Sequence, residues 1–102
     1  MNVHILTVAQ QEVEEASDYY EEQREGLGRQ FILAFEETLN DIQLFPGLGS
    51  KVEENCRRRR FKKFPYGIVY GLHDGEIYVL AVMHLHRKPG YWRDRLKDFE
   101  KE

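Results

Sequence analysis

The chain has 102 residues, enough for one compact domain over residues 1–102, and 41% of them are hydrophobic, so a buried core can form. No apolar run approaches the roughly 18 residues of a membrane-spanning helix, and the first residues, MNVHILTVAQQ, lack the basic and apolar regions of a signal peptide. We therefore expect no membrane contact and a cytoplasmic location, in which the single cysteine, Cys56, stays reduced.

The net charge of −3 conceals two halves of opposite sign. Residues 1–55 hold three basic and twelve acidic residues, a net charge of −9, whereas residues 56–102 hold twelve basic and six acidic residues, a net charge of +6. The basic half can meet a polyanion or an acidic protein surface, but the acidic half repels nucleic acid at close range. Domains dedicated to nucleic acid usually have a pI above about 9, so the pI of 5.8 argues against that class.

A strand and a helix are expected first. The stretch Val3–Thr7 is short and β-rich, and Thr7 is the expected N-cap, with Gln10 completing a capping box. The helix that follows carries acidic residues in its first half, where the helix dipole favours negative charge. Its apolar stripe at helical spacing consists of Ala9, Val13, Ala16 and Tyr20.

A second helix follows a break at residues 25–28, whose sequence is Glu-Gly-Leu-Gly. Pro46 and Gly47 end it. Because the connection between the two amphipathic helices is short, they are expected to form an antiparallel hairpin. The apolar stripe of the second helix consists of Leu27, Phe31, Ala34, Phe35, Thr38, Ile42 and Phe45.

The rest of the chain predicts three further strands. A loop is expected at residues 46–55, strands at residues 57–64, 66–73 and 76–84, and a short helix from Trp92. Asp74-Gly75 between the last two strands is among the strongest short signals for a hairpin. The order β-α-α-β-β-β predicts an α+β fold, in which a helical hairpin packs on a small, mostly antiparallel four-stranded sheet.

A basic run precedes the expected hairpin, since six of the seven residues from Arg57 to Lys63 are Arg or Lys. Strand alternation directs Arg57 and Arg59 to one face with Phe61, and Arg58, Arg60 and Lys62 to the other, unless a bulge near residues 61–64 changes the phase. Charges on an exposed edge strand discourage aggregation. The run exceeds what edge protection requires, so a binding face is the favoured interpretation.

The end of the last expected strand, MHLHRKPGYW, gathers side chains that could exchange protons or hold a phosphate. They are His84, His86, Arg87, Lys88, Tyr91 and Trp92. The His-x-His pair lacks nearby ligands with metal-site spacing, so no metal is expected. A structural role is favoured for His84, hydrogen-bonded at the end of the sheet, and Trp92 is expected to pack at a chain reversal.

Taken together, these features resemble the RelE/ParE superfamily of bacterial toxins from type II toxin–antitoxin modules. The resemblance spans nearly the whole chain and rests on the element order, on RRRRFKKFPYGIVY before the Asp-Gly turn, and on AVMHLHRKPGYWRDRL. The spacing of His84, Arg87, Pro89 and Trp92 resembles the ParE-like side especially. The resemblance implies a toxin that a cognate antitoxin neutralises by wrapping its C-terminal segment around it.

The ParE-like side implies inhibition of DNA gyrase by binding, with no cofactor, no favoured catalytic residue and no sequence-specific DNA binding by the toxin alone. The residues expected to contact the target or the antitoxin are Arg57, Arg58, Arg59, Arg60, Lys62, Lys63, Arg87, Tyr91 and Trp92.

Two alternatives stay open. The RelE-like side implies an endonuclease that cuts mRNA on the ribosome, and its catalytic candidates here are His84, His86, Arg87 and Tyr91. RelE-like members carry a catalytic arginine in a Tyr-Arg-hydrophobic-Val-Tyr motif, at the position that Gly67 occupies in this chain. The second alternative is a decayed toxin that acts only as an antitoxin-binding module.

Overall fold

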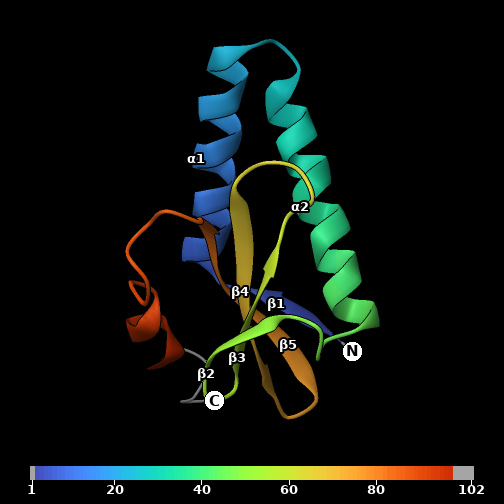
Figure 1. Cartoon of the computed structure of the whole chain (residues 1–102), viewed down its shortest axis with the longest axis vertical. Coiled ribbons are helices and arrows are strands. Elements are labelled where there is room, and N and C mark those ends of the chain that lie inside the picture. The colour runs from blue at the N-terminus through green and yellow to red at the C-terminus, as the bar shows by residue number, and fades with distance from the viewer. Residues whose placement is uncertain (1, 98–102) are drawn as a thin grey trace.

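The structure is a computed structural model that describes residues 2–97, so the domain expected over residues 1–102 extends beyond it at both ends (Figure 1). The elements are β1 (Val3–Ile5), α1 (Thr7–Gln23), α2 (Leu27–Leu44), β2 (Ser50–Glu53), β3 (Cys56–Arg60), β4 (Tyr66–His73), β5 (Glu76–His84) and the 3-10 helix η1 (Arg93–Arg95). The strands form one sheet in the order β1-β5-β4-β3-β2, parallel between β1 and β5 and antiparallel elsewhere. The predicted α+β class and helical hairpin are confirmed.

The predicted strand count was wrong, because the stretch expected to be a loop contains β2. This strand pairs antiparallel with β3, with Ser50 opposite Arg58 and Lys51 opposite Arg57. The turn between them uses Asn55 at a φ of 87°, a left-handed conformation that asparagine tolerates better than most residues. The sequence of β2 has no apolar alternation, so its strand conformation comes from the open edge that β3 offers.

The first helix also begins differently from the prediction. Leu6 is its N-cap and Thr7 is already helical, and no side chain caps this end among the described residues. Leu6 donates its backbone N–H to the carbonyl oxygen of Val79 at 3.1 Å, which extends the pairing between β1 and β5. The chain is therefore still held in the sheet at residue 6, and the expected Thr7–Gln10 capping box does not form.

The helical hairpin depends on two glycines and one carboxylate. Gly26 has a φ of 87°, and the carboxylate of Glu21 accepts hydrogen bonds from the backbone N–H groups of Gly26 and Gly28 at 2.9–3.1 Å. These hydrogen bonds lower the pKa of Glu21. A Cβ atom at position 28 would lie 2.6 Å from the carbonyl oxygen of Ser17, so only glycine lets the helices approach this closely.

The sheet has an apolar cluster on each face. The larger one lies beneath the helices and includes Ala9, Val13, Phe31, Phe35, Ile42, Phe61, Ile68 and Tyr70. The smaller one lies on the opposite face and includes Cys56, Val69, Leu80, Met83 and Trp92. Trp92 is only 3% exposed, which confirms that it packs. Among residues 2–97, no helix is long and apolar enough to cross a membrane.

Candidate functional site

The basic run is divided between the two faces of the sheet. Arg57 and Arg59 point to the helical side, where Arg57 Nη1 donates to the carbonyl oxygen of Gly49 at 2.8 Å and Arg59 Nη2 lies 3.9 Å from the Asp41 carboxylate. Arg58 lies on the opposite face and lines a hollow of about 170 Å³ together with Trp92. The predicted alternation is therefore correct for these arginines, and they do not form one continuous patch.

The two lysines do not follow the predicted alternation. Lys62 lies beside α2, with its Nζ 3.0 Å from the Glu37 carboxylate, which raises the pKa of Lys62. Lys62 and Lys63 line one hollow with residues of α2, so Lys62 does not share the face of Arg58. The reason is that β3 ends at Arg60 and not at residue 64, and the chain then enters a tight turn.

That turn is built around Phe64. Its φ of 73° is rare for an aromatic residue, and its ring packs against Tyr20 and Phe31 with centroids 4.7 and 5.3 Å apart. Phe61, buried in the core, donates its N–H to the carbonyl oxygen of Tyr66 at 2.9 Å. Aromatic packing thus holds the turn that breaks the phase of the basic strand.

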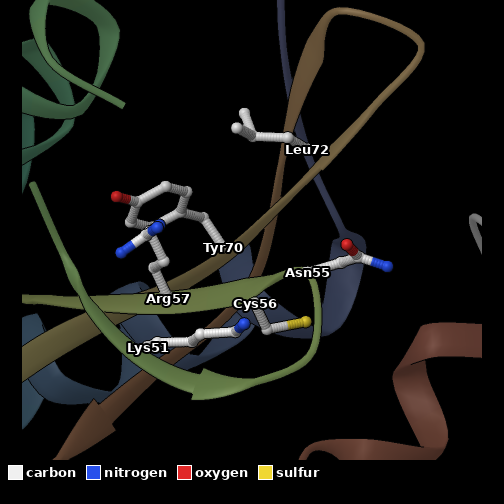
Figure 2. A pocket seen from close by; sticks show the side chains of 6 residues that line it. All are labelled: Lys51, Asn55, Cys56, Arg57, Tyr70 and Leu72. Atoms are coloured by element: carbon white, nitrogen blue, oxygen red, sulfur yellow. The ribbon is translucent and has the colours of Figure 1, made fainter. Parts of the chain in front are cut away.

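A hollow of about 190 Å³ lies on the helical side of the basic strand (Figure 2). Lys51, Arg57 and Tyr70 form a row across three neighbouring strands, because Arg57 is the register partner of both other residues. The Tyr70 hydroxyl donates to the carbonyl oxygen of Pro46 at 2.6 Å and accepts the N–H of Gly49 at 3.3 Å. Burial raises the pKa of Tyr70, so this hydroxyl stays a protonated anchor for the chain that follows α2.

The C-terminal cluster is organised by Glu12 of α1. Its carboxylate accepts hydrogen bonds from the Tyr91 hydroxyl at 2.6 Å, from the Arg95 guanidinium at 2.7 and 3.1 Å, and from the backbone N–H of Val82 at 3.0 Å. Arg87 Nη1 lies 3.5 Å from the same carboxylate. One side chain of the first helix therefore connects β5 with the segment that follows it.

Sequence reasoning missed Glu12, although a signal exists. Glu12 lies three residues after Ala9 and four before Ala16, within the apolar stripe of α1. An acidic residue on the buried stripe of a helix needs a partner, and its side chain is only 12% exposed here. The other acidic residues of the first half of α1, Glu14, Glu15 and Asp18, are exposed.

Two guanidinium groups lie close to the Tyr91 ring. The Arg87 guanidinium lies 3.6 Å from the centre of the Tyr91 ring and that of Arg95 lies 5.0 Å away, both within the range of cation–π attraction. Burial and the hydrogen bond to Glu12 raise the pKa of Tyr91 far above its usual value. The tyrosine is thus a neutral hydrogen-bond donor and a poor general base.

The histidines lie at the end of β5. The His84 ring contacts Tyr66 edge-on at 5.2 Å and lies 5.1 Å from the His86 ring, and its Nδ1 accepts the backbone N–H of His86 at 3.1 Å. His84 is therefore packed and hydrogen-bonded at the end of the sheet, as predicted. Within the described part of the chain, no three His, Cys, Asp or Glu side chains converge on a point that could hold a metal ion.

Two of the ribonuclease candidates, His84 and Arg87, share one hollow of about 180 Å³ between α1 and β5. The same hollow is lined by Glu12 and Glu15, whose negative charge opposes a phosphate. The His86 side chain is exposed and does not line this hollow. The chemistry that these groups support best is recognition by hydrogen bonding and charge.

Gly67 adjoins the stem of Arg58. A Cβ atom at position 67 would lie 3.1 and 3.3 Å from Cγ and Cδ of Arg58, and 3.3 Å from the carbonyl oxygen of Arg59. The Arg58 stem thus occupies the space above this glycine. Its Nε is buried and has no hydrogen-bond partner among the described residues.

Comparison with known proteins gives the family. The family model of the ParE toxin of the type II toxin–antitoxin system, parDE, matches residues 3–89. A solved structure described as the chromosomal ParDE TA system from P. aeruginosa has the same fold, with a TM-score of 0.73 at 14% identity over 82% of this chain and 95% of that chain. No curated protein sequence matches. Because the family model spans most of the chain, this protein belongs to the ParE toxin family, within the RelE/ParE superfamily of type II toxins.

Proposed function

We propose that this chain is a cytoplasmic toxin that inhibits DNA gyrase by binding to it, that it cuts no RNA, and that a cognate antitoxin holds it inactive. Membership of the ParE family supports the gyrase assignment, since the ParE-like side of the superfamily resembles gyrase inhibitors. The observation that carries the non-enzymatic part is the engagement of both Arg87 and Tyr91 by the Glu12 carboxylate.

Arg87 and Tyr91 are two of the four residues that a ribonuclease interpretation would assign to the substrate. A guanidinium must face the scissile phosphate, and an acid or base must lie within hydrogen-bond reach of the reacting oxygen. Here Gly67 supplies no side chain. The Tyr91 hydroxyl donates a hydrogen bond to the Glu12 carboxylate, whose negative charge would repel the phosphate. The pairing of Tyr91 with Glu12 and the missing side chain at position 67 therefore support a chain that binds its target without cutting RNA.

Neutralisation by an antitoxin is supported by apolar surface that the described fold leaves uncovered. Leu44, Phe45 and Leu48, at the end of α2 and just beyond it, are 59–62% exposed. Exposed apolar side chains that gather at one place mark interaction sites in soluble proteins. Co-expression with the neighbouring gene product should therefore yield a tight complex and restore growth.

The deciding experiment measures gyrase inhibition with the purified chain and mRNA cleavage in cells that express it. We expect it to inhibit supercoiling by gyrase, and primer extension on mRNA from expressing cells to show no new cuts in ribosomal A sites. Gly67→Arg should not create nuclease activity, because one added guanidinium does not by itself bring the other groups into the alignment, within roughly 1 Å, that catalysis requires. Lys88→Ala, at an exposed neighbour of Arg87, is the matched surface control for Arg87→Ala.

The alternative of a ribosome-dependent endonuclease is favoured only by the shared hollow of His84 and Arg87. Clean A-site cuts by the unmodified chain, lost in His84→Ala, Arg87→Ala or Tyr91→Phe but kept in Lys88→Ala, would replace the proposal by this alternative. A chain that neither cuts RNA nor inhibits gyrase, yet binds its antitoxin, would leave only the binding module.

A further inference from the structure

The hollow in Figure 2 is lined by two cations from neighbouring strands, with the charged end of Arg57 drawn beside the Tyr70 ring and that of Lys51 near Cys56. Lys51 of β2 and Arg57 of β3 are register partners in the antiparallel pair, so both side chains leave the sheet on the same face. Like charges placed directly opposite each other destabilise a sheet. Within residues 2–97, neither side chain forms an ion pair with a carboxylate, and the only hydrogen bond of Arg57 is to the neutral carbonyl of Gly49.

The hollow is a formed feature of the fold. Arg57 is oriented by its 2.8 Å hydrogen bond to Gly49, and Gly49 is itself fixed by the Tyr70 hydroxyl. A Cβ atom at position 49 would lie 2.6 Å from that hydroxyl, so the close approach requires glycine. The Arg57 guanidinium is thus oriented before any ligand binds, which lowers the entropic cost of binding.

The surroundings favour a peptide over a nucleic acid. The hollow is also lined by Leu72, which is 39% exposed, and the chain that leads into it carries the exposed Phe45 and Leu48. A peptide segment with both acidic and apolar side chains can contact the two cations and these apolar residues at the same time. A long polyanion would match only the cations, and residues 1–55 of this chain, with their net charge of −9, would repel it.

We propose that Lys51 and Arg57 form a binding site for a carboxylate side chain of an acidic peptide segment from a partner protein. An apolar side chain of the same segment lies against Phe45 and Leu48. The carboxylate removes the repulsion between the two cations by lying between them, and the flat guanidinium holds it with charge-assisted hydrogen bonds. Only the identity of that partner as the antitoxin rests on the proposed function; the site itself does not.

The test is an NMR titration of the full chain, which follows the Nε–H signal of Arg57. The probes are the peptide Ac-Leu-Glu-Glu-Leu-NH2, its neutral analogue Ac-Leu-Gln-Gln-Leu-NH2, and inorganic phosphate. We expect saturable shifts with the acidic peptide, at least about tenfold weaker binding of the neutral one, and a similar loss in Lys51→Gln and Arg57→Gln. Arg29→Gln, which removes a charge of the same sign from an exposed position of α2, should bind as the unmodified chain does.

Lys51 is exposed, so Lys51→Gln keeps the test valid if Arg57→Gln fails to fold. Equal binding of both peptides, or equal losses in Arg29→Gln and Lys51→Gln, would overturn the proposal. Phosphate that binds more tightly than the acidic peptide would overturn it in favour of a polyanion. None of these results depends on gyrase, so they are separate from the test of the proposed function.

Discussion

Tyr91 and Glu12 are joined by a 2.6 Å hydrogen bond that ties the segment following the last strand to the first helix. The same carboxylate pairs with Arg95 at 2.7 Å and is 12% exposed. The segment after β5 is therefore fixed to the domain by a partly buried network on one side and by the buried Trp92 on the other. Substitutions in the Glu12 network and at Trp92 test each of these two contacts.

Glu12→Gln should destabilise the fold markedly. The change removes the negative charge that Arg95 and Tyr91 face, and hydrogen bonds to charged groups each contribute about 1.5–3 kcal/mol. We expect a loss of about 2–4 kcal/mol in the free energy of unfolding, measured by urea denaturation followed by far-UV circular dichroism. Glu14→Gln, an exposed change of the same kind in the same helix, should stay within about 0.5 kcal/mol. Equal midpoints for the two variants would contradict the structural role of Glu12.

Tyr91 should make the fold sensitive to high pH. Its pKa is raised in the folded chain, whereas an unfolded tyrosine loses its proton near pH 10. Above that pH the unfolded state binds fewer protons than the folded one, so the free energy of unfolding falls as pH rises; below it, the contribution is constant and fully present.

Tyr91→Phe removes this titration, so its stability should decline less steeply than that of the unmodified chain between about pH 9 and about pH 11. Urea midpoints over this range provide the measurement. Tyr19→Phe, at a side chain that is 57% exposed, should retain the full slope. Parallel slopes for Tyr91→Phe and the unmodified chain would show that Tyr91 ionises equally in both states.

Gly28→Ala should force the helices of the hairpin apart. The new methyl group would lie 2.6 Å from the backbone oxygen of Ser17, which cannot move without moving α1. Overpacking of this kind costs about 1–3 kcal/mol. The matched control is Gly47→Ala, where the methyl group meets no atom within 4 Å, and its thermal midpoint should stay within a few degrees of that of the unmodified chain. If both midpoints fall equally, the contact with Ser17 is not what requires glycine at position 28.

Trp92→Ala should remove the largest side chain of the second apolar cluster. Truncation of a buried tryptophan costs about 3–5 kcal/mol, because the space left behind is only partly refilled. Trp92→Phe should recover part of this loss. Because Trp92 is the only tryptophan of the chain, circular dichroism and not fluorescence must follow unfolding. An unchanged midpoint in Trp92→Ala would contradict the packing role of Trp92.

The sequence predicted the elements whose signals are local. The two helices follow from their apolar spacing, and the β4–β5 hairpin follows from Asp74-Gly75, which have φ values of 50° and 75° as the tight turn requires. β2 could not be predicted in this way, because its residues form a strand only by pairing with β3. The expected Thr7 cap was wrong for a similar reason. The hydrogen bond from Leu6 to Val79 sets where the sheet ends and the helix begins, and no local pattern predicts it.

The candidate site was predicted less well than the fold. Composition singled out the cations, but the break in phase at Lys62 depends on the packing of Phe64 against residues far away in the chain. Glu12 was missed because charge in the first turns of a helix has a common explanation in the helix dipole. Its partners Tyr91 and Arg95 are about eighty residues away, and no local pattern connects them.

The parallel pairing of β1 with β5 has a consequence for synthesis on the ribosome. Val3 pairs with Ile77, so the N-terminal strand has no place in the sheet until the chain has been made as far as the fifth strand. Pairings between residues this distant carry a high contact order and form slowly, since the loop must close before the contacts stabilise it. The nascent chain can form its helical hairpin early, but the finished sheet, and every surface that depends on it, can arise only late in translation.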